Sequence, residues 1–520
     1  GASLDYFGYG RFFRELPARF PSQNIGLPSV AEQQQFGGLL RDIWSARSET
    51  APPNTGLNLS LGDRFGPFGF ELAGIYTTEY QTVHDEVVRQ FFNQGTPENP
   101  SISENPDNFR NNSSTFKTTL GGILTSAYQP SPNHRFTFRA LIDRNTRDEV
   151  DEAVGTTNTA PDLTTSTAGL RYVDEQLEFG QLASEHRFGF LEVNLRSAFA
   201  RTTQNVPDGR ITTYAAAPGE APSFQSTGNG GLRYYSCLDE NLTDSAVDFT
   251  IPFKTALPFT DAWSGLPAKF TFGPAHSYRD RDFHLRRLQY TPGSPLDLTQ
   301  SPEELLNPDN IGHGLQFQET TEARDSFSAT QEIIAGYGMF DLPIIVNRLR
   351  FIAGVREEYS FIRLRTVNDE SNPVSPTKRN LDPLPGASII YTPRSDMNVR
   401  FGFGQTVSRP DFRELTPTLY PSLRFDRAQT GNPNLVEASI RSYDLRWEWF
   451  FAPGELASLG GFYKTLDKPI EQTVIVGASD LRDSFANAEN GELEGFEFEV
   501  RKNFGFIRPR LTYLSLQTNV

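Results

Sequence analysis

The chain has 520 residues, of which 37% are hydrophobic and 12% aromatic, including 42 Phe and 18 Tyr. So many aromatic residues exclude a disordered chain, and a formal net charge of −16 argues against a nucleic-acid partner, which would require a basic face. No run approaches the ~18 consecutive apolar residues of a transmembrane helix, although a β-barrel would conceal its apolar residues by alternation.

Cysteine content and the first residues say little about the cell compartment. The single cysteine, Cys237, excludes a disulfide within the chain but fits either a reducing compartment or a protein that avoids thiols. The opening residues GASLDYFGYG contain no Met, no basic region and no apolar region. We therefore expect either that a signal peptide has been removed or that this is an internal piece of a longer protein.

Segments in which apolar and polar residues alternate recur along the chain. Successive side chains of a strand point to opposite faces, so each such segment predicts a strand with one apolar face and one polar face. Many run ~9–11 residues or more, the length that crosses a bilayer at a tilt of roughly 45°, whereas soluble strands have mostly ~5–6 residues. The polar face often carries full charges, which is typical of a water-filled lumen. The clearest segments are 135–143, 191–199, 348–356, 397–408, 442–451 and 496–501.

The connections between these segments alternate between short and long. Short ones end a strand with an aromatic residue and turn within a few residues, as at Tyr128-Gln129-Pro130, Tyr391-Thr392-Pro393 and Phe451-Ala452-Pro453. Short turns on one side and long loops on the other describe an outer-membrane barrel with an aromatic girdle. We therefore predict an all-β, antiparallel transmembrane β-barrel with about 16–17 strands in this chain, their limits between 202 and 345 being the least defined. The long loops are expected near 80–116, 145–165, 202–230, 288–314, 365–382, 409–438 and 467–486.

Several motifs of enzymes and metal sites are missing. Gly402-Phe403-Gly404 lacks the third glycine and the following helix of a dinucleotide site, so we expect lumen-facing glycines that make room or let the strand bend. No GxSxG elbow occurs, and carboxylate pairs such as Glu497 and Glu499 are better explained as one strand face. We predict no catalytic residues, no metal site and no cofactor. The histidines, none at HxH or HExxH spacing, are His84, His134, His186, His276, His284 and His313.

Two charged clusters are candidates for ligand binding. In the stretch SYRDRDFHLRRLQY, Arg279, Arg281, Arg286 and Arg287 could meet an anionic ligand bidentately, or could form ion pairs across strands inside the lumen. Where the strand 397–408 enters its loop, three further charged residues could line a ligand route or brace the loop against the wall. The candidate ligand-binding residues are Arg409, Asp411, Arg413, Arg286 and Arg287.

The chain resembles TonB-dependent receptors, the active-uptake barrels of Gram-negative outer membranes. The segment Val407–Leu415, followed by Gly431–Leu435, is similar to the "SRP.FREL" and "GNP.L" stretches of the family. Residues 487–497 resemble its "GVE.E" strand, Leu384–Ser388 its "LPG.S" strand start, and Arg14–Pro17 the "R.LP" of an early extracellular loop. In family order these motifs span most of the chain.

The resemblance implies a 22-stranded barrel that holds a plug. No plug domain or TonB-contacting box is visible, and the chain ends at Gln517-Thr518-Asn519-Val520 without the terminal aromatic of the family. We therefore expect residues 1–520 to be a partial barrel with long extracellular loops, which begins near the end of the first strand and lacks the plug and the last strands.

As function, the resemblance implies a receptor of the bacterial outer membrane with no enzyme activity. It would bind a scarce extracellular solute, such as a ferric siderophore, cobalamin or an oligosaccharide, and import it with energy from TonB, which would act through the plug segment. Its partners would be outer-membrane lipid, TonB and the solute. Two alternatives remain: a passive porin-like channel, and a soluble secreted all-β binding protein or carbohydrate-active enzyme whose apolar faces pack as a core.

Overall fold

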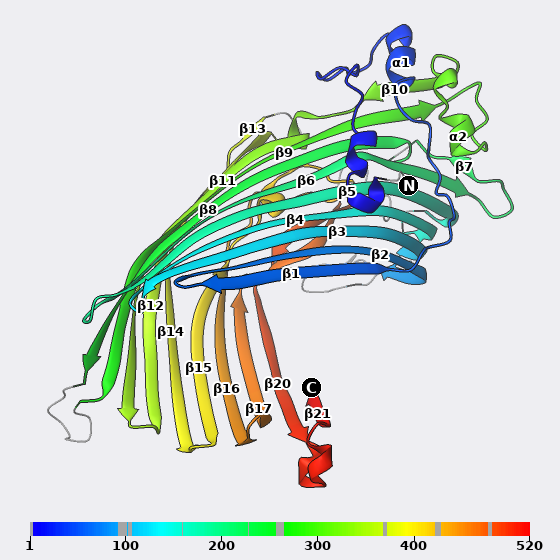
Figure 1. Ribbon diagram of the computed structural model, residues 1–520. Helices are drawn as coiled ribbons and strands as arrows, with labels where there is room; N and C mark the ends of the chain where they lie inside the picture. Colours follow the sequence, from blue (N-terminus) through cyan, green and yellow to red (C-terminus); the bar gives the residue numbers. More distant parts are fainter. Residues whose placement is uncertain are drawn as a thin grey trace.

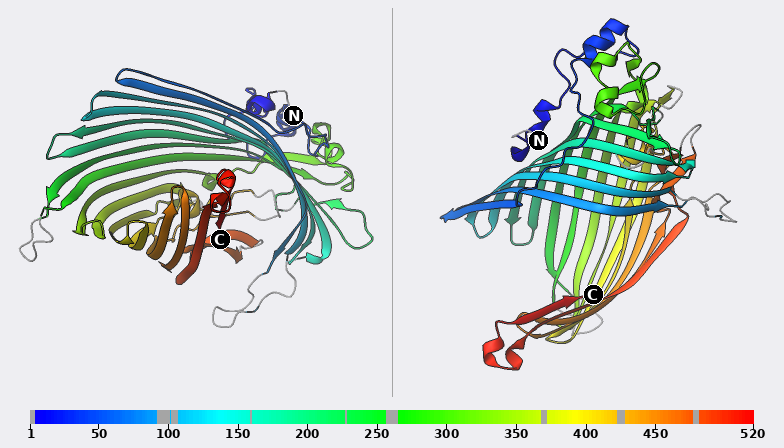
Figure 2. Two further views of the ribbon diagram at one scale, coloured as in Figure 1. Left: turned by 60° about the horizontal axis from the view of Figure 1, so that its bottom comes forward. Right: turned by 90° about the vertical axis from the view of Figure 1, so that its right-hand side faces the viewer.

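The chain folds into one large curved antiparallel sheet (Figures 1 and 2). The structure is a computed structural model that describes residues 4–91, 101, 107–158, 160–226, 228–255, 265–367, 372–421, 428–476 and 481–520. Among these residues, no helix has the length and apolar character needed to cross a membrane. The predicted all-β, antiparallel class is therefore what the described residues form.

Fifteen strands of at least 11 residues build the wall in the described part of the chain, and each pairs antiparallel with the next. With the short edge strand β21 (Ser515–Asn519), they agree with the predicted number. The long strands are β1 (Thr55–Phe65), β2 (Phe68–Gln90), β3 (Asp107–Ser131), β4 (His134–Thr157), β5 (Ala160–Arg187), β6 (Glu192–Ala216), β8 (Leu232–Lys254), β9 (Pro267–Pro292), β11 (Ser326–Ile345), β12 (Leu349–Val367), β14 (Thr377–Arg394), β15 (Met397–Ser408), β16 (Ala438–Ala452), β17 (Glu455–Asp467) and β20 (Asn490–Asn503).

The remaining elements are short and lie in the connections. Three α-helices are described, α1 (Val30–Gly37), α2 (Pro302–Leu305) and α3 (Phe412–Leu415). The short strands besides β21 are β7 (Ser223–Phe224), β10 (Leu315–Glu319), β13 (Pro373–Val374), β18 (Ile470–Val476) and β19 (Leu481–Asn487). Single 3₁₀ turns occupy Asp5–Phe7, Gly10–Phe13, Pro308–Asn310, Ala323–Asp325, Phe504–Phe506 and Pro509–Leu511.

Several predicted loops are strand extensions instead. Strands β4 and β5 stay paired through most of 145–165, β6 continues to Ala216, and β18 and β19 make a hairpin in 467–486. These predictions were wrong because the extensions lose the alternation on which the prediction depended. In the extension of β4, NTRDEVDEAV, both faces carry polar residues, since both contact water or other protein segments.

The two faces of the wall differ in chemistry, and the register keeps them separate. Ile389, Phe401 and Leu445 are directly paired across β14, β15 and β16 on the face that we call the outer face. They are 40%, 41% and 55% exposed, so no protein segment covers them. Exposed apolar residues continue around this outer face at Phe136, Phe138, Ile142, Leu182, Leu195, Phe199, Ile334, Phe340, Val355, Leu459, Phe496 and Phe498.

The opposite face, which we call the inner face, carries a ladder of ion pairs. Arg400 on β15 lies 2.8 Å from Glu448 on β16, and Arg446 on β16 lies 3.2 Å from Glu499 on β20. Arg501 then pairs with the same Glu499 at 2.7 Å. These pairs follow strands that all have an exposed apolar outer face. The wall therefore has an apolar side and a charged side, as the alternation predicted.

The apolar part of the outer face is a band rather than the whole strand. On β4 it runs from His134, beside the short turn, to Ile142, and the next outward residues are Arg144, Thr146 and Asp148. This is ~9 residues, about the length that a tilted strand needs to cross a bilayer. Beyond the band the strands continue toward the long connections, where the outer face becomes polar.

The glycines of Gly402-Phe403-Gly404 face inward, as predicted. Gly402 pairs with Asp444 and Gly404 with Ser442, both on the inner face of β16. A Cβ at Gly404 would have nothing within 4 Å, and one at Gly402 would only touch Asp444 Cβ at 3.8 Å. The segment leads into another strand pairing and not into a nucleotide-binding turn.

Residues 4–45 cover the outer face beyond the apolar band, over the ends of β3 to β9 that lie toward the long connections (right-hand side of Figure 1). Trp44, only 2% exposed, packs edge-on against Tyr290 of β9, with ring centroids 5.2 Å apart. Beside them the buried carboxylate of Asp208 lies 2.5 Å from Arg233 and also binds Arg210. Burial alone would raise the pKa of Asp208, but the two arginines hold it below its usual value.

A charge placed in the apolar band tests which side of the wall contacts lipid. We expect Leu445→Arg to lower the free energy of unfolding in lipid vesicles by about 2–4 kcal/mol, since it exposes an arginine to hydrocarbon. The control is Ser388→Arg. Ser388 pairs with Gly402 in the row of residues next to that of Leu445, and its side chain faces inward near Gly402 and Asp444. The control is expected to change stability by less than ~1 kcal/mol. Urea titrations followed by tryptophan fluorescence measure both, and equal losses would contradict the assignment of the faces.

Candidate functional site

The candidate site lies at the inner face, where the connection from β15 to β16 folds back onto the wall. Strand β15 ends at Ser408, and Pro410, which has no N–H to donate, begins the departure from the sheet. Asp411 then caps α3 by accepting a hydrogen bond from the Arg413 N–H at 3.0 Å, while the Asp411 N–H donates to Glu414 at 2.8 Å. This capping box turns the chain sharply toward the inside.

Apolar side chains fix this connection to the inner face. Phe412, Leu415 and Leu435 are at most 1% exposed and join a cluster with residues of six wall strands. Burying a side chain of this size contributes about 1.5–3 kcal/mol each. We call residues 409–421 and 428–437 the inner segment. The wall residues of the cluster are Val173, Val206, Ile211, Leu232, Tyr234, Phe283, Leu285, Phe327, Ala329, Ile362 and Leu364.

Arg409 holds the start of the inner segment to two wall strands. Its guanidinium lies 2.9 Å from Glu358 on β12, 2.6 Å from Asp382 on β14 and 3.5 Å from Glu437, at the end of the same segment. Its side chain is only 12% exposed. Because one arginine faces three carboxylates, the interaction ties both ends of the segment and the wall together.

Asp411 makes the second connection, to β9. Arg281 lies 2.9 Å and Arg279 3.3 Å from its carboxylate, and Arg279 also stacks on the Phe412 ring at 4.2 Å. Burial alone would raise the pKa of Asp411, but Arg281 and the Arg413 N–H outweigh it and lower the pKa. Arg281 in turn pairs with Glu240 on β8 at 2.6 Å. Arg279 and Arg281 thus form the ion pairs across strands that the sequence allowed as one alternative.

Arg413 is the most accessible candidate. Its side chain is exposed, donates to Gln429 at 2.6 Å and stacks on the ring of Tyr420 at 4.4 Å. It has no carboxylate partner among the described residues, unlike Arg409. Of the five candidates, Arg413 therefore presents the most available positive charge toward the mouth of the wall.

The adjacent arginines of β9 point to opposite faces. Arg287 faces inward, pairs with the buried Asp325 at 2.9 Å and also donates to the Leu419 carbonyl of the inner segment. Arg286 faces outward, pairs with Glu319 at 2.7 Å and donates to the carbonyls of Pro21 and Gln23. The prediction treated them as one cluster, but successive side chains of a strand point to opposite faces. Arg286 therefore anchors residues 4–45 over the outer face.

The structure therefore brings together Arg409, Asp411, Arg413 and Arg287 at the inner face and separates Arg286 from them. Ligand contact by these residues stays a prediction. Glu240, Glu358 and Asp382 were missed in the sequence, although each occupies a polar position of an alternating segment. Among the described residues, no three His, Cys, Asp or Glu side chains converge as metal ligands.

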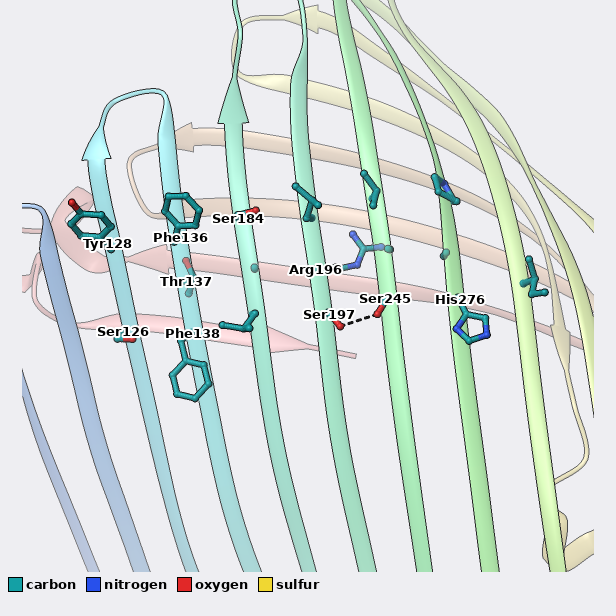
Figure 3. A pocket seen from close by; sticks show the side chains of 18 of the residues that line it. Ser126, Tyr128, Phe136, Thr137, Phe138, Ser184, Arg196, Ser197, Ser245 and His276 are labelled. Carbon is teal, nitrogen blue, oxygen red and sulfur yellow. Dashed lines mark hydrogen bonds between the residues drawn. The ribbon is translucent and has the colours of Figure 1, made fainter.

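The outer face also contains a hollow of about 800 Å³, which lies across β2 to β11 (Figure 3). Its apolar lining includes Phe136, Phe138, Leu182 and Leu195 of the band, and Ser197 and Ser245 share a hydrogen bond of 2.8 Å across it. The hollow is on the face opposite the inner segment. It belongs to the surface that would contact lipid and does not form part of the candidate site.

Removing Arg409 tests whether it braces the inner segment. We expect Arg409→Met to lower the free energy of unfolding by about 3–5 kcal/mol, because Asp382 and Glu437 would lose the cation that they share and Glu358 would keep only Arg356. The matched control within the same segment is Arg413→Met, whose exposed charge should contribute less than ~1 kcal/mol. Limited proteolysis of the segment should show the same order, and a stable Arg409→Met protein with a protected segment would refute the brace.

The inner segment should also respond to pH. Burial and the neighbouring Asp382 raise the pKa of Glu437 to about 7, although Arg409 opposes the shift. A pKa raised by folding means that the docked state favours the protonated acid, so docking weakens as pH rises through about 7. The lowered pKa of Asp411 weakens docking only in the acid range, below the ordinary value of an aspartate.

We therefore expect amide hydrogens of the inner segment to exchange faster at about pH 8.5 than at about pH 6, after correction for intrinsic rates. Hydrogen-exchange mass spectrometry measures this, and Glu437→Gln should abolish the difference because its amide does not titrate. An unchanged pH effect in Glu437→Gln would assign the titration to another group.

The comparisons with known proteins agree with this architecture. The sequence of residues 182–519 matches the family described as TonB dependent receptor-like, beta-barrel. No curated protein sequence matches the chain.

Several solved structures are similar to this chain. One is Pseudomonas aeruginosa FpvA bound to heterologous pyoverdines, with 12% identity over 87% of this chain and 52% of that chain, at a TM-score of 0.51. The ferric citrate transporter FecA shows 12% identity over 90% of this chain and 58% of that chain, at a TM-score of 0.48. The Serratia marcescens hemophore receptor HasR shows 10% identity over 86% of this chain and 61% of that chain, at a TM-score of 0.46.

The chain thus spans between 52% and 61% of the length of these three structures. At such low identity, the likeness to FpvA supports the fold alone. The family match, by contrast, covers well over half of the chain and includes the strands that carry the candidate site. The chain belongs to the TonB dependent receptor-like β-barrel family.

Proposed function

We propose that this chain forms the wall and part of the ligand-binding surface of an outer-membrane receptor that imports a scarce solute with energy from TonB. The observation that carries the proposal is the inner segment, held by Arg409 and Asp411 on the charged face of a wall whose other face is an exposed apolar band. A wall of this kind suits a lipid environment outside and water inside. We place the protein in the bacterial outer membrane.

The two alternatives fit the structure less well. A soluble all-β protein would bury the apolar strand faces in a core, whereas Leu182 and Phe496 on the outer face are 65% and 78% exposed. A passive porin would share the wall, but family membership favours a receptor. An enzyme finds no support either, because the family consists of receptors and transporters.

We also propose that the wall is one part of a larger barrel. Within the described residues, β1 is an edge of the sheet, and an unpaired strand edge cannot face hydrocarbon without a large cost in free energy. Further strands would close the wall, and a plug inside it would make the contact with TonB. Residues 1–520 would then be the partial barrel expected from the sequence.

The mechanism would be binding that shifts a two-state element, without covalent change of the solute. The solute classes consistent with this proposal are ferric siderophores, cobalamin and oligosaccharides. Arg413 is the residue that we expect to contact an anionic solute first, because its charge is exposed above the inner segment. Arg409, Asp411 and Arg287 would position that surface through the ion pairs already described.

Transport assays in strains with and without TonB test this function. We expect cells that express the full-length protein to bind the solute in both strains but to accumulate it only when TonB is present. Radiolabelled ferric siderophores, cobalamin and maltooligosaccharides are suitable probes. Arg413→Gln should weaken binding of an anionic solute by about five- to tenfold, with Arg64→Gln, an exposed inner-face arginine near the short turn, as the control.

Planar bilayers separate the receptor from a porin. The full-length protein should not conduct ions steadily, because a plug would block the barrel. A steady open conductance together with TonB-independent accumulation would overturn the proposed function and support a passive channel.

A further inference from the structure

We propose that Arg363, Arg365 and Arg379 form a binding site for the phosphate of an anionic lipid headgroup, at the border of the apolar band on the outer face. We call these three residues the outer arginine patch. The inference goes beyond transport, since it concerns the lipid around the wall and not the cargo inside it. It requires only that the wall lies in a membrane.

The register places the patch on the outer face. Tyr359 on β12 pairs with Ile334 on one side and Leu381 on the other, all of them exposed apolar residues of the outer face. Arg363 lies four residues beyond Tyr359 on the same strand, and Arg379 lies two residues beyond Leu381 on its own strand. Since side chains alternate, both arginines point the same way as these apolar residues.

The height of the patch matches the edge of a hydrocarbon layer. On β14 the outward positions between Tyr391 and Leu381 are all apolar, and Arg379 is the next outward residue. Ten residue steps at ~3.3 Å give about 33 Å along the strand, or roughly 25 Å across the membrane at the usual tilt. The outer apolar band of a membrane barrel has about this height, so Arg379 lies at the level of the headgroups.

The charges of the patch have no ion-pair partner within the part of the chain that the structure describes. Arg363 and Arg379 both stack on the ring of Phe361, at 5.4 Å and 5.3 Å from its centroid. All three arginines are exposed, and none forms an ion pair with another described residue. Two guanidinium groups on one ring repel each other, so an anion that lies between or above them would stabilise the arrangement.

Nearby carboxylates are engaged elsewhere or lie too far along the sheet. Glu332, beside Phe361 in the register, pairs with His276 at 3.0 Å. Asp280 is separated from Arg363 by Thr330 on the intervening strand and accepts a hydrogen bond from Asn241 at 3.2 Å. Glu357 lies six residues below Arg363 on the same strand. No acidic side chain of the described wall therefore neutralises the patch.

Other arginines of the outer face show the contrast. Arg201 pairs with Asp239 at 2.5 Å, Arg144 with Asp174 at 2.6 Å and Arg286 with Glu319 at 2.7 Å. In a chain with a net charge of −16, carboxylate partners are plentiful. The arginines of the patch, which have no ion-pair partner among the described residues, thus lie at the edge of the apolar band, where lipid headgroups would offer an anion.

A phosphorylated lipid fits both halves of the site. Guanidinium groups bind phosphate through paired, charge-assisted hydrogen bonds. Immediately below the arginines, Tyr359 and Leu381 are 42% and 61% exposed and offer an apolar surface for the acyl chains. A free phosphate would use the arginines alone, whereas a lipid would use both surfaces. We therefore assign the site to a lipid of the membrane layer on the side of the long connections.

The test compares lipid retention by the full-length protein and two double variants. Native mass spectrometry and a fluorescent-lipid competition assay would use phosphatidylglycerol as the anionic probe and phosphatidylcholine as the neutral one. The test variant is Arg363→Gln with Arg379→Gln. The matched control is Arg201→Gln with Arg110→Gln, which also removes two charges from the outer face, but from arginines that pair with Asp239 and Asp85.

We expect the wild type and the control to prefer phosphatidylglycerol, and the test variant to bind it on the order of 25-fold more weakly, at about fivefold for each of the two arginines. Binding of phosphatidylcholine should not change. If the test variant does not fold, Arg363→Lys with Arg379→Lys provides the same comparison. It keeps the charges but not the bidentate geometry, and should retain only part of the preference.

Three results would overturn the proposal: no preference for phosphatidylglycerol in the wild type, equal loss in the control, or displacement of the lipid by millimolar inorganic phosphate, which would indicate a site for a free anion. The transport assay of the full-length protein is independent of these results. Absence of a phosphatidylglycerol preference in the wild type, together with intact uptake, would refute this inference alone, whereas absence of TonB-dependent uptake would refute the proposed function alone.

Discussion

One wall must suit two solvents, lipid on one face and water on the other. Backbone N–H and C=O groups cannot remain unpaired in hydrocarbon, so each long strand must pair with its neighbours over the whole membrane thickness. The side chains must then divide by position, with Ile389, Phe401 and Leu445 on the apolar face and Arg400 and Glu448 on the charged one. A shift of one residue in register would exchange the faces, which is why both chemistries specify the same pairing.

The charged face serves two purposes at different levels of the wall. Near the short turns its ion pairs, such as Arg446 with Glu499, join neighbouring strands. Near the long connections the same type of residue holds the inner segment, where Arg409 meets carboxylates from two strands and Asp411 meets Arg281 from a third. Interactions of this kind depend on geometry and on protonation, because burial changes the free energy of every charge involved. The inner segment is therefore fixed to the wall but remains sensitive to pH through Glu437.

Sequence alone predicted the strands where the two faces differ and failed where they do not. Alternation identified β12, β15 and β16, and the tripeptides around Tyr128, Tyr391 and Phe451 identified short turns. The upper halves of β4 and β5 were missed because both of their faces are polar. The site shows the same limit. Composition marked Arg286 and Arg287 as a cluster, but only the strand assignment shows that one faces the outer cover and the other the inner segment.

The ion-pair partners of these arginines could not be predicted from the sequence for a further reason. Arg409 and Glu358 are 51 residues apart, and Arg281 and Asp411 are 130 apart. Each pair depends on the register of several strands, so no local pattern indicates it. An arginine without a partner is harder still to recognise in sequence, because Arg363 and Arg409 look alike until the carboxylates around each are known. In the structure, a charge within the inner ion-pair network contributes to holding the wall and its segment together, whereas a charge left unpaired at the edge of the apolar band is free to bind something outside the chain.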